Sequence, residues 1–190
     1  MKSSKEELRI TLLWATSVGK TCILARYTTK RYEEDPPSNI CAGNYYKEFD
    51  NYVLNIWDTA GKEMFHSLTR IYTKDSAAVI LVYEPCNRES FDALRFYVEI
   101  AQQTAIENAL YVVVQNKNDI REKIVSESEG EQYANSLGGY FCVVSALTGQ
   151  GIENLFKLIF SKSPWRYRLL SLFVNKKKRK INKIKNKCLV

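Results

Sequence analysis

The stretch Leu8-Arg-Ile-Thr-Leu-Leu-Trp14, continued by Ala15-Thr-Ser-Val-Gly-Lys-Thr21, decides the fold that we expect for this chain. Its first half is an apolar run typical of a buried strand, and the residues from Lys20 to about Thr29 read as a helix. A phosphate-binding loop needs backbone N–H groups around the phosphates, a lysine for the β and γ oxygens, and a hydroxyl for Mg²⁺. Gly19, Lys20 and Thr21 supply these parts, although Trp14 stands at the motif's opening glycine. On its own, this match would be ascribed to chance.

Around this stretch, short apolar runs alternate with amphipathic ones. Such alternation predicts an α/β fold with a mostly parallel sheet, whose functional loops lie at the carboxyl edge. A hairpin is expected around Asp50-Asn51. The expected strands are Leu8–Trp14, Tyr45–Phe49, Tyr52–Trp57, Ala77–Tyr83, Leu110–Gln115 and Tyr140–Val144, and the later helices are Ser90–Thr104, Ser126–Ser136 and Ile152–Ser161.

Three further motifs follow expected strands. In Trp57-Asp-Thr-Ala-Gly-Lys-Glu63, an aspartate can hold Mg²⁺ through water and the glycine N–H can sense a γ-phosphate. In Asn116-Lys-Asn-Asp119, the last carboxylate can accept hydrogen bonds from N1 and N2 of guanine, which adenine does not offer. The pair Ser145-Ala146 places a backbone N–H where it can reach the guanine O6. The order of the four motifs argues against coincidence.

These motifs identify a resemblance to a known family. Residues 8–160 resemble the Ras-superfamily GTPases, and the segments Ile56–Gly61, Leu81–Glu84 and Ser145–Gly149 are most similar to Rabs. The resemblance implies a three-layer P-loop G domain over residues 1–162, with a mostly parallel six-stranded sheet and one antiparallel edge strand. Residues 163–190 are then a basic, variable tail.

The same resemblance assigns roles to individual residues. It implies a GTP or GDP site with Mg²⁺, in which Thr21 and Asp58 serve the metal and Lys20 and Lys62 stand at the catalytic positions. The residues implied for nucleotide binding are Ser17, Val18, Gly19, Lys20, Thr21, Cys22, Tyr32, Asp58, Gly61, Asn116, Lys117, Asp119, Ser145, Ala146 and Leu147.

By resemblance, the chain is expected to be a molecular switch that hydrolyses GTP slowly and serves vesicle and membrane trafficking. Effectors, an exchange factor and a GTPase-activating protein would bind its switch regions, and the protein would be a monomer. No nucleic-acid partner is expected, because no fold signature for one accompanies the basic residues.

Several departures from the family pattern keep an alternative open. Trp14 and Ser17 replace glycines, and Lys62 replaces the glutamine that orients the attacking water. The switch I threonine position falls on Asn39, with Ser38 beside it. These departures favour a pseudo-GTPase, a binding module that does not hydrolyse nucleotide or barely binds it. The retained phosphate and guanine motifs favour the active switch.

The charge distribution and the cysteine content limit the classes of partner and cofactor that we expect. The net charge of +7 is divided unevenly: from Asn154 onward there are twelve Lys or Arg residues and no acid, whereas the preceding part is mildly acidic. This tail, with apolar residues in Trp165–Val174, is expected to bind anionic membranes.

Five scattered cysteines and one histidine argue against a zinc site and against disulfides. We expect a cytoplasmic protein that is peripheral on a membrane's cytosolic face, and the ending Cys188-Leu-Val leaves prenylation open.

Overall fold

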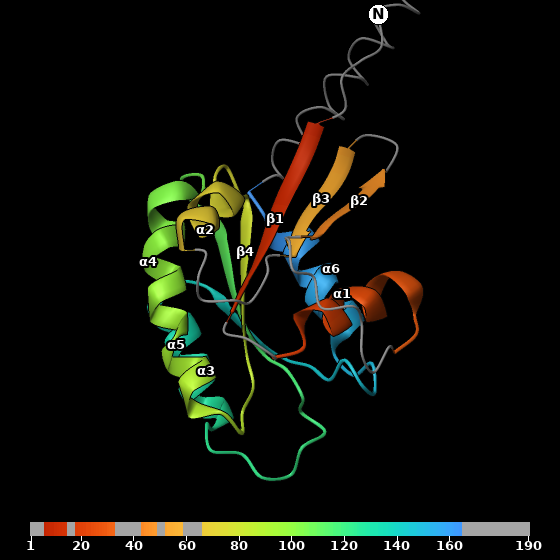
Figure 1. Ribbon diagram of the computed structural model, residues 1–190, viewed down its shortest axis with the longest axis vertical. Helices are drawn as coiled ribbons and strands as arrows, with labels where there is room; N and C mark the ends of the chain where they lie inside the picture. The colour runs from red at the N-terminus through yellow and green to blue at the C-terminus, as the bar shows by residue number, and fades with distance from the viewer. Residues whose placement is uncertain (1–5, 15–17, 33–42, 49–51, 59–65, 165–190) are drawn as a thin grey trace, which may run out of the picture.

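The computed structural model describes residues 6–14, 18–32, 43–48, 52–58 and 66–164. Within this part of the chain, six strands form one sheet in the order β2-β3-β1-β4-β5-β6 (Figure 1). The strands β2 and β3 pair antiparallel at the edge, whereas all other pairs are parallel. The fold class expected from the sequence is therefore confirmed. The strands are β1 Glu6–Trp14, β2 Gly43–Glu48, β3 Tyr52–Asp58, β4 Ala78–Tyr83, β5 Leu110–Gln115 and β6 Tyr140–Val143.

Helices cover both faces of the sheet and make the three layers seen in Figure 1. The first layer holds α1 (Lys20–Thr29) and α6 (Ile152–Lys162), whose Tyr27 and Phe156 rings stack at a centroid distance of 3.7 Å. The other layer holds α2 (His66–Thr73), α3 (Arg88–Asp92), α4 (Leu94–Thr104) and α5 (Glu127–Ser136).

Alternate residues of the central strands feed the two halves of the core. Leu12 of β1 packs with the α1 and α6 side chains, whereas its neighbour Leu13 packs with those of α4 and α5. The strand β4 is buried along its whole length. Burial on both faces explains why these strands read as continuous apolar runs in the sequence.

One helical prediction needs correction, and one helix was missed. The helix expected over Ser90–Thr104 begins at Arg88, because Asn87 caps it and accepts from the Ser90 N–H at 3.1 Å, and it is divided at Ala93 into α3 and α4. The helix α2 was not expected at all. By contrast, α5 begins where the Ser126 capping box directs it, with Ser126 and Glu129 each bonding the other's backbone N–H.

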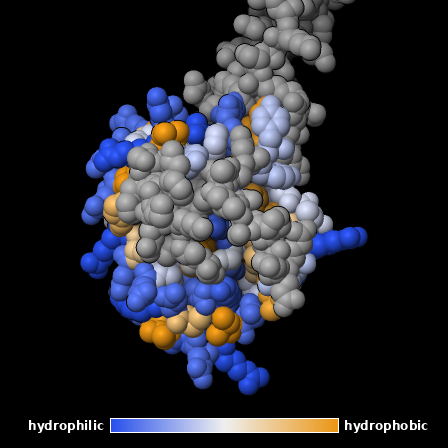
Figure 2. Space-filling view, in the orientation of Figure 1, coloured by the Kyte–Doolittle hydropathy of each residue, from blue (hydrophilic) through white to orange (hydrophobic). Residues whose placement is uncertain are grey.

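Most of the coloured residues on the face drawn in Figure 2 are polar, and the hydrophobic ones among them gather only in small groups. Among the described helices, none has both the length and the apolar character that a bilayer crossing requires.

Candidate nucleotide-binding site

Asn116 joins the carboxyl edge of the sheet into one site. It directly follows β5 and is almost fully buried. Its Nδ2 donates to the Val18 carbonyl at 2.8 Å and to the Gly19 carbonyl at 3.4 Å, while its Oδ1 accepts from the Ala146 N–H at 3.1 Å. One side chain therefore fixes the segments after β1, β5 and β6 relative to each other, at the lower end of the sheet in Figure 1.

Gly19 is required at the start of α1 for two reasons. Its φ of +81° is the left-handed conformation that residues with a side chain adopt at a cost. A Cβ atom there would also lie 2.6 Å from Asn116 Nδ2. Any other residue would therefore displace Asn116, and with it the connection between the phosphate loop and the β6 loop.

Lys20, Thr21 and Asp58 lie together beside this loop. The Thr21 hydroxyl donates to Asp58 Oδ2 at 2.8 Å, and Asp58, the last residue of β3, is buried. Burial lowers the pKa of Lys20, while the nearby Asp58 carboxylate opposes that shift. A cation that has lost hydration interacts more strongly with an anion brought to it.

The oxygen pair of Thr21 and Asp58 fits Mg²⁺. This ion prefers oxygen ligands, keeps several waters, and is typically held by one or two protein groups together with substrate phosphates. In the described residues no group of three or more His, Cys, Asp or Glu side chains gathers to hold a metal. A sparse hydroxyl and carboxylate pair therefore suits a metal that a nucleotide would help to hold.

A second set of contacts orients Asp119. Its side chain is exposed, and Oδ1 accepts from the buried Ser145 hydroxyl. The Ser145 hydroxyl in turn accepts from the Thr148 N–H at 3.1 Å. One oxygen of the carboxylate is thus fixed by a hydrogen bond, while the side chain remains exposed, as a group that recognises a ligand requires.

Lys117 is held by a contact that the sequence did not indicate. Its Nζ lies 2.6 Å from Glu84 Oε2, and Glu84 Oε1 accepts from the Cys86 thiol at 2.7 Å. The φ of Lys117 is +59°, a left-handed conformation that is uncommon for residues with a side chain and often marks functional sites. Glu84 ends the segment that resembles Rabs, and its position just past β4 explains the pairing.

Arg26 is another residue that the sequence did not indicate. From the last turn of α1, its Nε donates to the Ala146 carbonyl at 2.9 Å and its Nη2 donates to the Leu147 carbonyl. Ala146 is buried, whereas Leu147 is 48% exposed. The loop after β6 is therefore bound from two sides, by Asn116 and by Arg26.

For the remaining predicted residues, the structure gives a position, or they lie outside the described residues. Val18 is buried, and Cys22 in the first turn of α1 has a pKa raised by burial. Tyr32, exposed and just beyond α1, keeps its expected role beside the base as a prediction.

Trp14 ends β1 in register with Val82, so its backbone is extended and needs no glycine. Ser17, Gly61, Lys62, Ser38 and Asn39 lie outside the described residues.

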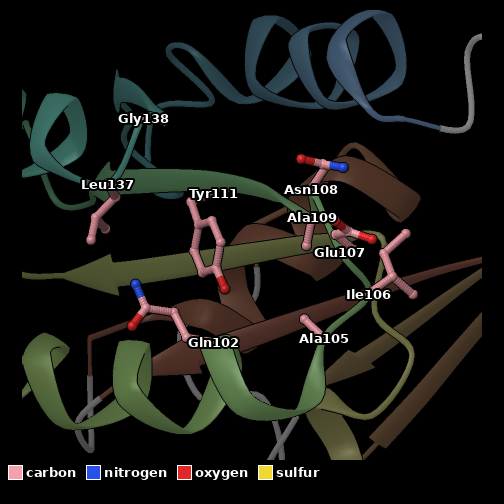
Figure 3. Close-up of a pocket in the computed structure, with 9 residues that line it drawn as sticks. All are labelled: Gln102, Ala105, Ile106, Glu107, Asn108, Ala109, Tyr111, Leu137 and Gly138. Carbon is pink, nitrogen blue, oxygen red and sulfur yellow. The ribbon is translucent and has the colours of Figure 1, made fainter.

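A pocket of about 670 Å³ lies away from this site (Figure 3). Its lining comes from the end of α4, from the segment before β5, and from the turn before β6. These residues stand at the amino ends of β5 and β6, whereas the motifs follow the carboxyl ends. The pocket therefore is not part of the candidate nucleotide site.

Comparison with known proteins shows the family of this chain. The profile of the Ras family matches residues 9–164. A zebrafish (Danio rerio) protein named DnaJ homolog subfamily C member 27 is 36% identical over 174 residues, with 84% of this chain and 63% of that protein covered. The chain thus spans less than two thirds of this relative.

Proposed function

The chain belongs to the Ras family of small GTP-binding proteins, and from this premise we propose that it is a Rab-like switch. In this proposal, GTP and GDP bind with Mg²⁺, GTP is hydrolysed slowly, and the nucleotide state controls partners in membrane trafficking. The observation that carries the proposal is the position of Asn116, whose three hydrogen bonds join the phosphate loop to the guanine loop.

The proposal assigns the phosphates and the base to separate groups. Lys20 would neutralise phosphate oxygens, and Thr21 and Asp58 would hold Mg²⁺, which supplies charge compensation for the phosphates. Asp119, oriented by Ser145, would accept from N1 and N2 of guanine. Adenine lacks these donors and would leave a carboxylate unpaired, which is costly. GDP, but not ADP, should therefore displace a fluorescent GDP from the protein in the presence of Mg²⁺.

The alternative of a pseudo-GTPase is favoured by Lys62 and by Trp14. The extended backbone of Trp14 weakens one half of that argument, because a strand conformation tolerates tryptophan. The retained Lys20, Thr21, Asp58 and Asp119 support nucleotide binding. We therefore propose binding with impaired hydrolysis rather than loss of binding.

Replacing Lys62 by glutamine should accelerate hydrolysis. A glutamine accepts from the nucleophilic water while its amide donates to developing charge, whereas an ammonium group can only donate. A lost positioning contact of this kind costs on the order of a hundredfold, or about 2.7 kcal/mol of barrier. Single-turnover hydrolysis of bound GTP by Lys62→Gln is the measurement.

Trp14→Gly is the companion variant for this measurement. If the rate stays unchanged in Lys62→Gln and rises in Trp14→Gly, the tryptophan rather than the lysine limits hydrolysis. If neither variant hydrolyses GTP faster, the assigned cause of slow hydrolysis is wrong.

We also propose that the basic tail holds the protein on the cytosolic face of an anionic membrane. Residues 175–190 contain eight Lys or Arg and no acid. Each basic residue near an anionic surface contributes about 1 kcal/mol, and salt screens this attraction. Co-sedimentation of the full chain with liposomes should require acidic lipid, fall steeply with salt, and disappear when residues 175–190 are deleted.

The control for the tail is a full-length chain in which Lys176–Lys180 is replaced by glutamines. It should lose most binding while keeping the apolar segment. Equal binding of the intact chain to neutral and acidic liposomes would contradict the electrostatic account. It would point instead to residues 165–174 or to a lipid on Cys188.

Partners follow from the family in general terms. Proteins of the Ras family are controlled by regulators and act through effectors. We propose that this chain is a monomer controlled by an exchange factor and a GTPase-activating protein. Their contact regions would be the segments around residues 33–42 and 59–65, which lie outside the described residues.

A further inference from the structure

The Arg26 guanidinium is bonded entirely to backbone carbonyls in the contacts that the structure describes for it. Nε donates to the Ala146 carbonyl at 2.9 Å, Nη2 donates to the Leu147 carbonyl, and Nη1 donates to the Lys30 carbonyl at 3.2 Å. Two consecutive carbonyls are thus held by one planar fork from a different element, 120 residues away in sequence. Hydrogen bonds from a charged donor are about twice as strong as neutral ones.

Because peptide groups are planar, the contacts of Arg26 also fix N–H groups on the other side of the loop. In a trans peptide, the C=O of one residue and the N–H of the next point in opposite directions within one rigid plane. Fixing the Ala146 carbonyl therefore fixes the Leu147 N–H, which points away from Arg26. Fixing the Leu147 carbonyl likewise fixes the Thr148 N–H.

The Thr148 N–H continues the path to the carboxylate that would read guanine. It donates to the Ser145 hydroxyl at 3.1 Å, and that hydroxyl donates to Asp119 Oδ1. On the same loop, the Ala146 N–H faces Asn116 Oδ1. Arg26 therefore lies on one side of the loop after β6. The Leu147 and Thr148 N–H groups point to the opposite side, where Ser145 also holds Asp119.

We propose that Arg26 is a positioning residue for purine recognition, which sets the loop after β6 so that it can read O6 and the 2-amino group of guanine. This inference rests on the proposed function, because it assumes that guanine binds at Asp119 and at the Leu147 N–H, the Ala146 N–H being bonded to Asn116 Oδ1. Arg26 touches neither base nor phosphate in this account and acts through the loop alone.

Lysine at this position is a poor substitute. An ammonium group is a single point donor and lacks the rigid fork that bonds two carbonyls at once. Gly149, whose φ is +86°, packs beside the guanidinium: a Cβ there would lie 3.4 Å from Arg26 Nε.

The test is a comparison of three diphosphates on the full-length chain, by competition with a fluorescent GDP. GDP carries both groups, inosine diphosphate lacks the 2-amino group, and the 2-aminopurine ribonucleoside diphosphate lacks O6 and, with it, the N1–H. The variants are Arg26→Ala and Arg26→Lys. Arg31→Ala is the matched control, because it removes one exposed positive charge near the same helix end.

We expect Arg26→Ala to weaken GDP binding by about tenfold, as loss of one strong hydrogen-bonding group does. The two analogues should lose less, so that the affinity ratio of GDP to each analogue falls by roughly threefold or more. Arg26→Lys should resemble Arg26→Ala in these ratios, and Arg31→Ala should match the original protein.

Three outcomes overturn the inference. An equal loss for all three nucleotides in Arg26→Ala would show that Arg26 only stabilises the fold, which a lowered melting temperature would accompany. No loss at all would show that the loop is set without it. If the original protein binds none of the three, the proposed function fails and this inference fails with it.

Discussion

An Asp119→Asn chain is expected to lose about a thousandfold of its affinity for GDP and to gain affinity for xanthosine diphosphate. In the proposed site the Asp119 carboxylate accepts hydrogen bonds from N1 and N2 of guanine. In the variant one charged acceptor is lost and the amide N–H of asparagine faces an N–H of guanine, which together cost about 4 kcal/mol of binding free energy. Xanthine carries an oxygen in place of the 2-amino group, so the new amide N–H finds an acceptor there.

The structure also says which atom of the new amide should turn to the base. The Ser145 hydroxyl donates to Oδ1 of Asp119, so an asparagine keeps its oxygen toward Ser145 and presents its nitrogen at the other position. The measurement is the dissociation constant of each diphosphate by competition. The exposed Glu122, changed to glutamine, controls for the lost charge. Unchanged GDP affinity in Asp119→Asn would remove Asp119 from the site.

Replacing Asn116 by alanine is expected to damage both folding and binding. The buried amide makes three hydrogen bonds, and its loss leaves the Val18 carbonyl and the Ala146 N–H without this partner. The free energy of unfolding should fall by about 2–4 kcal/mol. Because the phosphate loop and the guanine loop are then no longer held together, GDP affinity should fall by at least about a hundredfold.

A second variant tests the donor side of this amide. Asn116→Asp keeps the acceptor for the Ala146 N–H but loses the donor toward the Val18 and Gly19 carbonyls. Because the new carboxylate is buried against two carbonyl oxygens, the free energy of unfolding, measured by denaturant titration, should fall at least as much as in Asn116→Ala, and GDP affinity, measured by competition, should fall with it. Asn118→Ala, in the same motif, serves as the control. If Asn116→Ala binds GDP as tightly as the original chain, the joining role is wrong.

The central strands β4 and β5 were predictable because they are buried on both faces. Runs such as Ala78–Tyr83 are apolar throughout, and that pattern survives without knowledge of neighbours. The helix α5 was predictable for a local reason as well, since its capping box lies within four consecutive residues.

The helix α2 shows why other elements could not be predicted. Its eight residues, His66–Thr73, include a β-branched isoleucine and two threonines, which are weak helix formers. Side chains of β1 hold its carbonyl end: the Thr11 hydroxyl donates to the Tyr72 carbonyl at 2.7 Å, and Arg9 Nη2 donates to the Ile71 carbonyl at 3.2 Å. These contacts join residues more than sixty positions apart, which no local pattern reveals.

The same distinction applies to the site. The phosphate loop and the guanine motif were predictable because their spacing follows the chemistry of a ligand. Arg26 and Glu84 were missed because they bond protein groups far away in sequence, the β6 loop and Lys117 respectively. The predicted roles of Lys62 and of Ser17 depend on segments outside the described residues.

The measurement that tests the central claim most directly is the nucleotide content of the purified full-length protein, determined by denaturation and chromatography. The account predicts guanine nucleotide in near-stoichiometric amount, with a substantial share of GTP because hydrolysis is slow, and a melting temperature raised by added GDP and Mg²⁺. Protein that carries no guanine nucleotide, and whose melting temperature ignores GDP, GTP and Mg²⁺, would contradict it and leave the pseudo-GTPase in its place.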